Sequence, residues 1–174
     1  MKYLVKFFVV TLFLIFCTAV TAEQNIVVLD LKYVLNNSKA GKGAQDFLKK
    51  SFKDSTQKYS DMEKALKKEE QDLLTKKTVL SKEEYVKKSD ALRKKVIDYQ
   101  SQRRASVDKI ATLRRESRQK LIDAIDPILD IYIKENNISL VIDKKSTLGG
   151  NQKTDITKII TEKLDKILPS LNLK

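Results

Sequence analysis

The sequence contains no histidine, no tryptophan and only one cysteine, and these absences exclude several kinds of active site. The common zinc sites need several Cys or His ligands, which this chain cannot supply. Catalysis of the Ser-His-Asp or Cys-His type is excluded because both need a histidine. Four glycines are too few for a glycine-rich phosphate loop, and two prolines in 174 residues are compatible with long helices. We therefore expect no metal, no cofactor and no enzymatic activity.

Residues 1–22 have the composition of a secretory signal peptide. Lys2 and Lys6 provide the positive start, and residues 7–17 form an unbroken run rich in apolar side chains. Small residues at the end of the segment place the expected cleavage after Ala22. The alternative is an uncleaved membrane anchor, but the uncharged stretch is shorter than the roughly 20 residues that span a bilayer. We expect a soluble mature chain beyond the inner membrane, which in a bacterium with two membranes means the periplasm.

Short apolar runs near the two ends of the mature chain predict a small β body. The run at 26–29 is typical of a buried strand, and residues 31–35 follow it as a short helical turn with Asp30 as N-cap. Residues 138–143 are a second candidate strand, and residues 146–148 are a third. Apolar residues on one face then predict a final helix over 155–168, capped by Thr154 or Asp155.

The central part of the chain predicts two long helices that form an antiparallel hairpin. Steps of three and four residues give an imperfect heptad-like stripe in 38–77 and another after Ser81, which with Glu84 forms an S-x-x-E capping box. Gly41 and Gly43 are expected to loosen the first turns, and Pro127 to kink or restart the second helix. Polar residues interrupt the stripes and predict a weak, flexible seam: Ser55, Glu69, Ser89, Arg103 and Ser106.

Together these elements predict an α+β protein that is mostly helical, with a long helical-hairpin arm on a small β body. We assign residues 23–37 and 137–174 to the body, and 38–136 to the arm with its tip near 78–81. Three short strands would leave open apolar edges, which strands from other copies could close into a barrel. The candidate residues for this shared core are Ile26, Val28, Leu140 and Ile142. The alternative is a monomeric three-stranded sheet covered by the last helix.

Positive charge is concentrated on the second arm helix. The net charge of the whole chain is +12, and all six arginines lie between residues 93 and 118. Ten basic and three acidic residues in 93–120 give this stretch a local charge of +7, which favours acidic partners. Nucleic acid could bind such a patch nonspecifically, but the predicted export makes it an unexpected partner. The alternative is a solvated helix face without a ligand.

Three blocks of this sequence resemble the Skp (OmpH-like) family of periplasmic chaperones. They are IVVLDLKYVLNNSKAGKGAQDFL at 26–48, RRESRQKLIDAIDPILDIYIKENNISLVID at 114–143 and KTDITKIITEKLDKI at 153–167. The resemblance implies a homotrimer in which strands of three subunits form a small barrel. It also implies three arms that enclose unfolded outer-membrane proteins without using ATP. Contacts with lipopolysaccharide have been proposed for the family, but no signature for a specific lipopolysaccharide site is present here. The basic stretch itself would also suit an anionic membrane surface.

We therefore expect the arm to hold clients through many weak contacts. The expected basic contacts are Arg93, Lys94, Lys95, Arg103, Arg104, Lys109, Arg114, Arg115 and Arg118. The expected shallow apolar contacts are Phe47, Phe52, Tyr59, Met62, Tyr85 and Tyr99. Charge would capture the client from a distance, and salt would screen this attraction. The main rival interpretation is a coiled-coil spacer or adaptor of the cell envelope, which strong heptads and a docking tip would favour.

Overall fold

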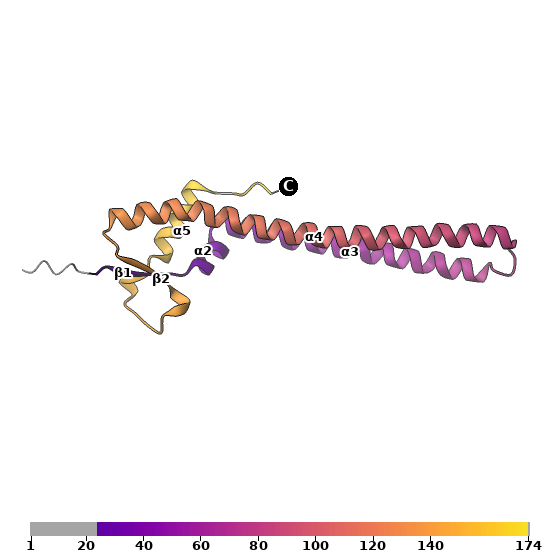
Figure 1. The fold of residues 1–174 in the computed structure, drawn as a ribbon, viewed down its shortest axis with the longest axis horizontal. Coiled ribbons are helices and arrows are strands. Elements are labelled where there is room, and N and C mark those ends of the chain that lie inside the picture. The colour runs from indigo at the N-terminus through magenta and orange to yellow at the C-terminus, as the bar shows by residue number, and fades with distance from the viewer. Residues whose placement is uncertain (1–23, 174) are drawn as a thin grey trace, which may run out of the picture.

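The computed structural model describes residues 24–173 as a small body with one long helical hairpin (Figure 1). In chain order the elements are β1 (Ile26–Leu29), α2 (Leu31–Asn37), α3 (Lys39–Thr75), α4 (Lys82–Glu135), β2 (Leu140–Asp143) and α5 (Thr157–Ile167). This confirms the predicted fold class. The predicted signal peptide, residues 1–22, and its cleavage site lie outside the described residues. Between residues 24 and 173, no helix combines the length and the apolar character that crossing a membrane requires.

Local capping signals fix where the two arm helices begin. The Ser38 side chain accepts a hydrogen bond from the Gly41 amide at 3.2 Å, at the start of α3. The predicted capping box is present at α4: the Ser81 hydroxyl accepts from the Glu84 amide, and the Glu84 carboxylate accepts from the Ser81 amide. These bonds satisfy amides that have no partner within the helix. The hydrogen bonds from Ser81 also lower the pKa of Glu84, because they stabilise its charged form.

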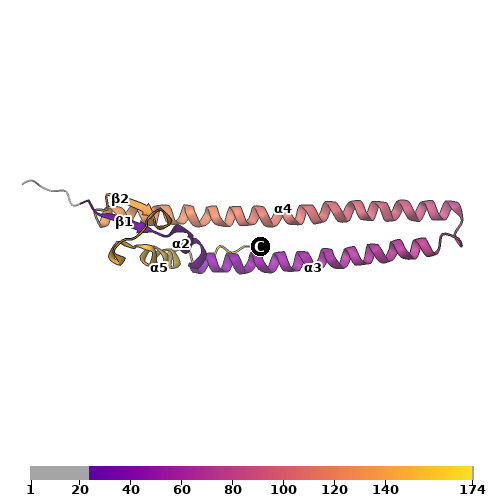
Figure 2. The ribbon, with the colours of Figure 1, turned by 90° about the horizontal axis from the view of Figure 1, so that it is seen from below.

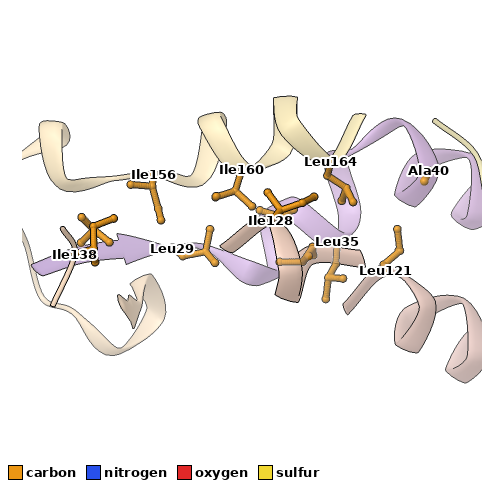
Figure 3. Close-up of a cluster of buried hydrophobic side chains, with 12 residues drawn as sticks. Leu29, Leu35, Ala40, Leu121, Ile128, Ile138, Ile156, Ile160 and Leu164 are labelled. Atoms are coloured by element: carbon orange, nitrogen blue, oxygen red, sulfur yellow. The ribbon is translucent and has the colours of Figure 1, made fainter. Parts of the chain in front are cut away.

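The hydrophobic core lies where the base of the arm meets the body (Figure 3). Helix α5 contacts both α4 and α2, and its Ile160 and Leu164 are fully buried. Figure 2 shows α5 and α2 beside the base of the two long helices, while the rest of the arm projects beyond the body. The core cluster consists of Val27, Leu29, Val34, Leu35, Ala40, Leu121, Ile125, Ile128, Ile138, Ile156, Ile160 and Leu164.

Strands β1 and β2 form a parallel pair with one face toward this core. Ile26 is opposite Leu140 and Val28 is opposite Ile142, so these four residues share one face of the pair. Val27 and Leu29 point the other way and are 5% exposed. Ile26 is 39% exposed and Leu140 is 51% exposed. The body therefore leaves an apolar sheet face open to solvent within a single chain.

The predicted third strand is wrong for the single chain. Residues Lys144–Ser146 form a 3₁₀ turn, and Thr147 leaves it in an extended conformation with no strand partner among the described residues. The side chain of Asp143 accepts from the Lys145 amide, and Lys144 pairs with Asp155 at 2.6 Å. These contacts turn the chain immediately after β2, so the local propensity for an extended strand does not decide its path.

Two smaller expectations about the helices also need correction. Helix α4 continues through Pro127 to Glu135 and does not restart. Pro127 has no N–H to donate to the Asp123 carbonyl, so this carbonyl lacks its usual helical hydrogen-bond partner. Both residues are exposed. Helix α5 begins at Thr157, two residues later than expected, although the Asp155 carboxylate still accepts from the Thr157 amide at 2.9 Å.

Candidate functional site

The two arm helices are joined midway by a pair of tyrosines. The rings of Tyr59 and Tyr99 meet edge to face, with their centroids 6.1 Å apart. The Tyr59 hydroxyl donates to the backbone carbonyl of Gln102 on α4 at 2.9 Å. Both tyrosines are 8% exposed. This corrects the expectation that they offer surface contacts, because their rings are used to hold α3 against α4.

Polar residues of the seam pair across it. The hydroxyls of Ser55 and Ser106 are 2.7 Å apart, so each satisfies the other between the helices. Nearer the tip, Lys95 on α4 contacts Glu69 on α3 at 2.6 Å. Both side chains of this ion pair are about half exposed, so it adds little to stability. These contacts fix the helix register at positions where the heptad pattern alone predicts weakness.

Glu63 lies beside the tyrosine pair in a small charged cluster. Lys67 contacts the Glu63 carboxylate at 2.8 Å, and the Tyr99 hydroxyl lies 3.3 Å from it. The hydrogen bond and the charge of Lys67 lower the pKa of Glu63, with a further contribution from the Tyr99 hydroxyl. The same contact raises the pKa of Lys67. Both shifts favour the charged forms of Glu63 and Lys67, as expected for an ion pair.

The arm carries shallow grooves between its helices. The base groove, of about 640 Å³, has an apolar floor that includes Leu48 and Leu121, with Arg114 and Arg118 at its wall. The distal groove, of about 480 Å³, lies nearer the tip, and Leu73, Leu92 and Val96 are among its apolar residues. Both grooves are open to solvent along the arm. They offer apolar surface without an enclosed pocket that would fit one small ligand.

Three of the four remaining predicted apolar contacts line hollows of the arm. Phe52 is 57% exposed and lies in the base groove, while Phe47 on the same helix is half-buried. Tyr85 is half-buried in the distal groove, and Met62 lines a smaller hollow on the arm. Sequence reasoning missed a further set of exposed apolar residues: Leu74, Val79, Val86, Ile97 and Val107. Their signal was available, because they are apolar residues that lie off the two heptad stripes.

All nine predicted basic residues are exposed, and they lie along α4. Arg93 is 3.7 Å from Asp90, and Lys95 binds Glu69. Across residues 24–173 the other seven make no ion pair: Lys94, Arg103, Arg104, Lys109, Arg114, Arg115 and Arg118. Arg93 reaches the distal groove, and Arg114 and Arg118 reach the base groove. The structure therefore brings basic and apolar side chains together at each groove and leaves most of the positive charge uncompensated.

The central tyrosine contact can be tested with Tyr59→Phe. The variant loses the hydrogen bond to the Gln102 carbonyl but keeps the ring packing, so we expect about 1 kcal/mol of lost stability. Tyr33→Phe is the matched control, because the Tyr33 side chain is half exposed and its hydroxyl makes no hydrogen bond within the described residues. Urea unfolding measures both. Equal effects of the two substitutions would contradict the role assigned to the Tyr59 hydroxyl.

Comparisons with known proteins agree with this geometry. A family model described as outer membrane protein (OmpH-like) matches residues 25–164. Among solved structures, the fold is similar to a protein from Caulobacter crescentus CB15 that is described as a candidate outer membrane chaperone (OmpH-like). The TM-score is 0.80 at 16% sequence identity, and the match covers 88% of this chain and 90% of that chain. No curated protein sequence matches the chain.

Proposed function

The chain belongs to the OmpH-like outer membrane protein family, and from this premise we propose that it is a chaperone that binds unfolded outer-membrane proteins. We propose further that it is an ATP-independent holdase of the periplasm, and that segment 1–22 is the signal peptide that directs its export. It holds the client in a cavity between the arms of several copies and prevents aggregation before membrane insertion. Enclosure would keep exposed client strands from pairing with one another.

One observation carries this proposal: uncompensated positive charge lies beside shallow apolar grooves along the arm. A holdase without a fuel must bind broadly and release readily, and many weak contacts suit this better than one deep pocket. Exposed Phe52 beside Arg114 and Arg118 is an example of such a mixed surface. The arginines attract an acidic client over a distance, and the apolar floor contacts its side chains at close range.

We further propose that several copies assemble through the open sheet face. Ile26 and Leu140 lie opposite one another on this face and are substantially exposed, although both are large and apolar. Val28 and Ile142 continue the same face and are half-buried. A contact between copies would cover this apolar surface, which a single chain leaves in water. The family resemblance implies that the assembly is a trimer, which gives three arms around one cavity.

The proposal is tested by binding of a urea-diluted porin to residues 23–174 at several salt concentrations. We expect Arg104→Gln, Arg114→Gln and Arg118→Gln together to weaken binding on the order of tenfold at low salt, because they remove uncompensated charge from the arm. A matched control removes the same charge from exposed lysines of the body: Lys32→Gln, Lys153→Gln and Lys158→Gln. Fluorescence anisotropy of a labelled porin gives the affinities.

Two outcomes would count against different parts of the proposal. Binding that responds neither to salt nor to the arginine substitutions would contradict the role of charge while leaving the grooves as the contact surface. An assembled protein that does not bind the porin or suppress its aggregation would contradict the chaperone function. A spacer or adaptor of the cell envelope would then be the better interpretation.

A further inference from the structure

The sequence contains two N-x-S motifs, the pattern that marks an asparagine as an acceptor for N-linked glycosylation. One motif begins at Asn36 and the other at Asn137, and neither has proline at its middle position. The second motif is longer, because Glu135 stands two positions before its asparagine and completes the pattern E-x-N-x-S. Bacterial oligosaccharyltransferases, which act on exported chains, favour an acidic residue at this position. The second motif is therefore the stronger candidate by sequence.

The second motif lies in the turn that joins α4 to β2. Asn137 has a φ of 49°, and the Ile138 amide donates to the Ile133 carbonyl at 3.0 Å, which closes the end of α4 with a left-handed residue. Glu135, Asn137 and Ser139 are all exposed. Figure 1 shows this turn at the end of the body that lies farthest from the arm tip. An enzyme could thus approach the motif from outside without meeting the arm.

The functional groups of this motif are left unused by the folded chain. Among residues 24–173, neither the Asn137 carboxamide nor the Ser139 hydroxyl has a hydrogen-bond partner. The adjacent Asn136 differs, because its carboxamide donates to the Tyr132 carbonyl at 2.9 Å. Glu135 comes only within 3.9 Å of Lys163, and its side chain is 58% exposed. All three recognition positions of the motif are therefore available to a partner.

The first motif is unsuited to glycosylation in the same structure. Asn36 lies within α2, and its side-chain oxygen accepts from the Gln45 side chain at 3.0 Å. Ser38 is fully buried, and its hydroxyl accepts from the Gly41 amide as the cap of α3. Two positions before Asn36 stands Val34, which is apolar and fully buried. The chain thus offers one available motif and one occupied motif, which serve as candidate and internal control.

Helix capping accounts for only part of the second motif. A residue at positive φ after a helix is usually glycine and sometimes asparagine, so the cap alone is a sufficient reason for Asn137. It gives no reason for the hydroxyl of Ser139, because the backbone amide is the group of this residue that the described fold uses, bonded to the Asn25 carbonyl at 2.8 Å. The complete motif therefore calls for a second explanation.

We propose that Asn137 is an acceptor site for N-linked glycosylation, with an oligosaccharide carried on a lipid diphosphate as the donor. The carboxamide nitrogen of Asn137 forms a bond with the anomeric carbon of the first sugar, and the bond from that carbon to the diphosphate oxygen breaks. The lipid diphosphate leaves with the bonding electron pair, and one amide proton passes to a base of the transferase. This inference rests on the export in the proposed function but not on client binding.

The test is transfer of an oligosaccharide to the folded protein. Residues 23–174 are incubated with a purified bacterial oligosaccharyltransferase and a lipid-linked oligosaccharide, and the intact mass is measured. We expect the mass to rise by one oligosaccharide, with the modified peptide containing Asn137. Asn137→Gln and Ser139→Ala should each abolish the added mass, and Glu135→Gln should lower its yield. Asn36→Gln is the matched control and should leave the yield unchanged, because it removes only the occupied motif.

Several outcomes would overturn the inference. An acceptor peptide in the same reaction shows that the enzyme and the donor are active, so a modified peptide beside an unmodified protein would refute the site. Modification at Asn36, or of the Ser139→Ala variant, would show that the motif and its exposure do not decide the reaction. Circular dichroism shows that each variant is folded.

The outcome is independent of the chaperone function. The glycosylated and unmodified proteins should bind the urea-diluted porin equally, since the turn lies at the opposite end of the molecule from the arm tip. If the protein is glycosylated at Asn137 but does not bind the porin, the proposed function fails and this inference remains. If the protein binds the porin but is not glycosylated, only this inference fails.

Discussion

Replacing Gly41 by alanine should destabilise the protein at the upper end of the roughly 1–3 kcal/mol typical of overpacking. A Cβ at this position would lie 2.0 Å from the backbone carbonyl oxygen of Leu35 and 2.9 Å from the Ser38 hydroxyl. The first contact is with backbone, so no side-chain rotation can relieve it. Helix α2 must move away from the start of α3, and Leu35 and Ala40 in the core would be displaced with them.

Gly43 provides the matched control for this prediction. A Cβ there would meet no atom within 4 Å, and the residue is exposed on the same helix. Gly43→Ala should therefore stabilise the protein by up to about 1 kcal/mol, since alanine has the higher helix propensity. Urea unfolding followed by circular dichroism at one fixed protein concentration measures both. Effects of the same sign would contradict the role of Gly41 in the approach of α2 to α3.

Leu164→Ala should be the most damaging truncation in the last helix. The side chain is fully buried, and α5 contacts both α2 and α4, so the residue helps to join the body to the base of the arm. Figure 3 shows it pointing into the cluster from α5, beside Ile160. Truncating a buried leucine to alanine costs about 2–5 kcal/mol, because transfer energy is lost and a cavity remains.

The control for Leu164→Ala is Ile167→Ala on the same helix. Ile167 is 66% exposed, so its truncation should change the unfolding free energy by less than about 0.5 kcal/mol. Thermal or urea unfolding of the two variants provides the comparison. Similar losses for both would mean that α5 does not use Leu164 as its main anchor.

The sequence predicts the helices of this fold well because their signals are local. Ser81 and Glu84 are three residues apart and form a capping box wherever the chain becomes helical. Asp30 likewise caps α2 by accepting from the Tyr33 amide at 2.7 Å. The predicted third strand failed because a strand needs a partner edge, which the local sequence of residues 146–148 cannot specify. The order of elements is thus easier to derive than their pairing.

The candidate site was predictable in composition but not in arrangement. The count of charged residues located the basic stretch, and all nine basic residues predicted as client contacts are exposed. Tyr59 and Tyr99 lie on the two predicted stripes, yet only the register between α3 and α4 determines that their rings meet and become buried. Gly41 shows the same limit, since its close contact with Leu35 arises from the angle between two helices.

The parallel pairing of β1 with β2 has a consequence for how the body closes. The whole arm is inserted between these strands, so that Asn25, which donates to the Asn136 carbonyl, bonds a residue 111 positions away. Closing a flexible loop of that length costs more entropy than closing a short one. The antiparallel arm already returns the chain to its starting point. The folding of the arm therefore covers about 2 kcal/mol of this loop-closure entropy, which the pairing of the strands need not offset. Melting the base of the arm would restore that cost, so damage to the helices would weaken the strand pairing as well as the core on which the sheet packs.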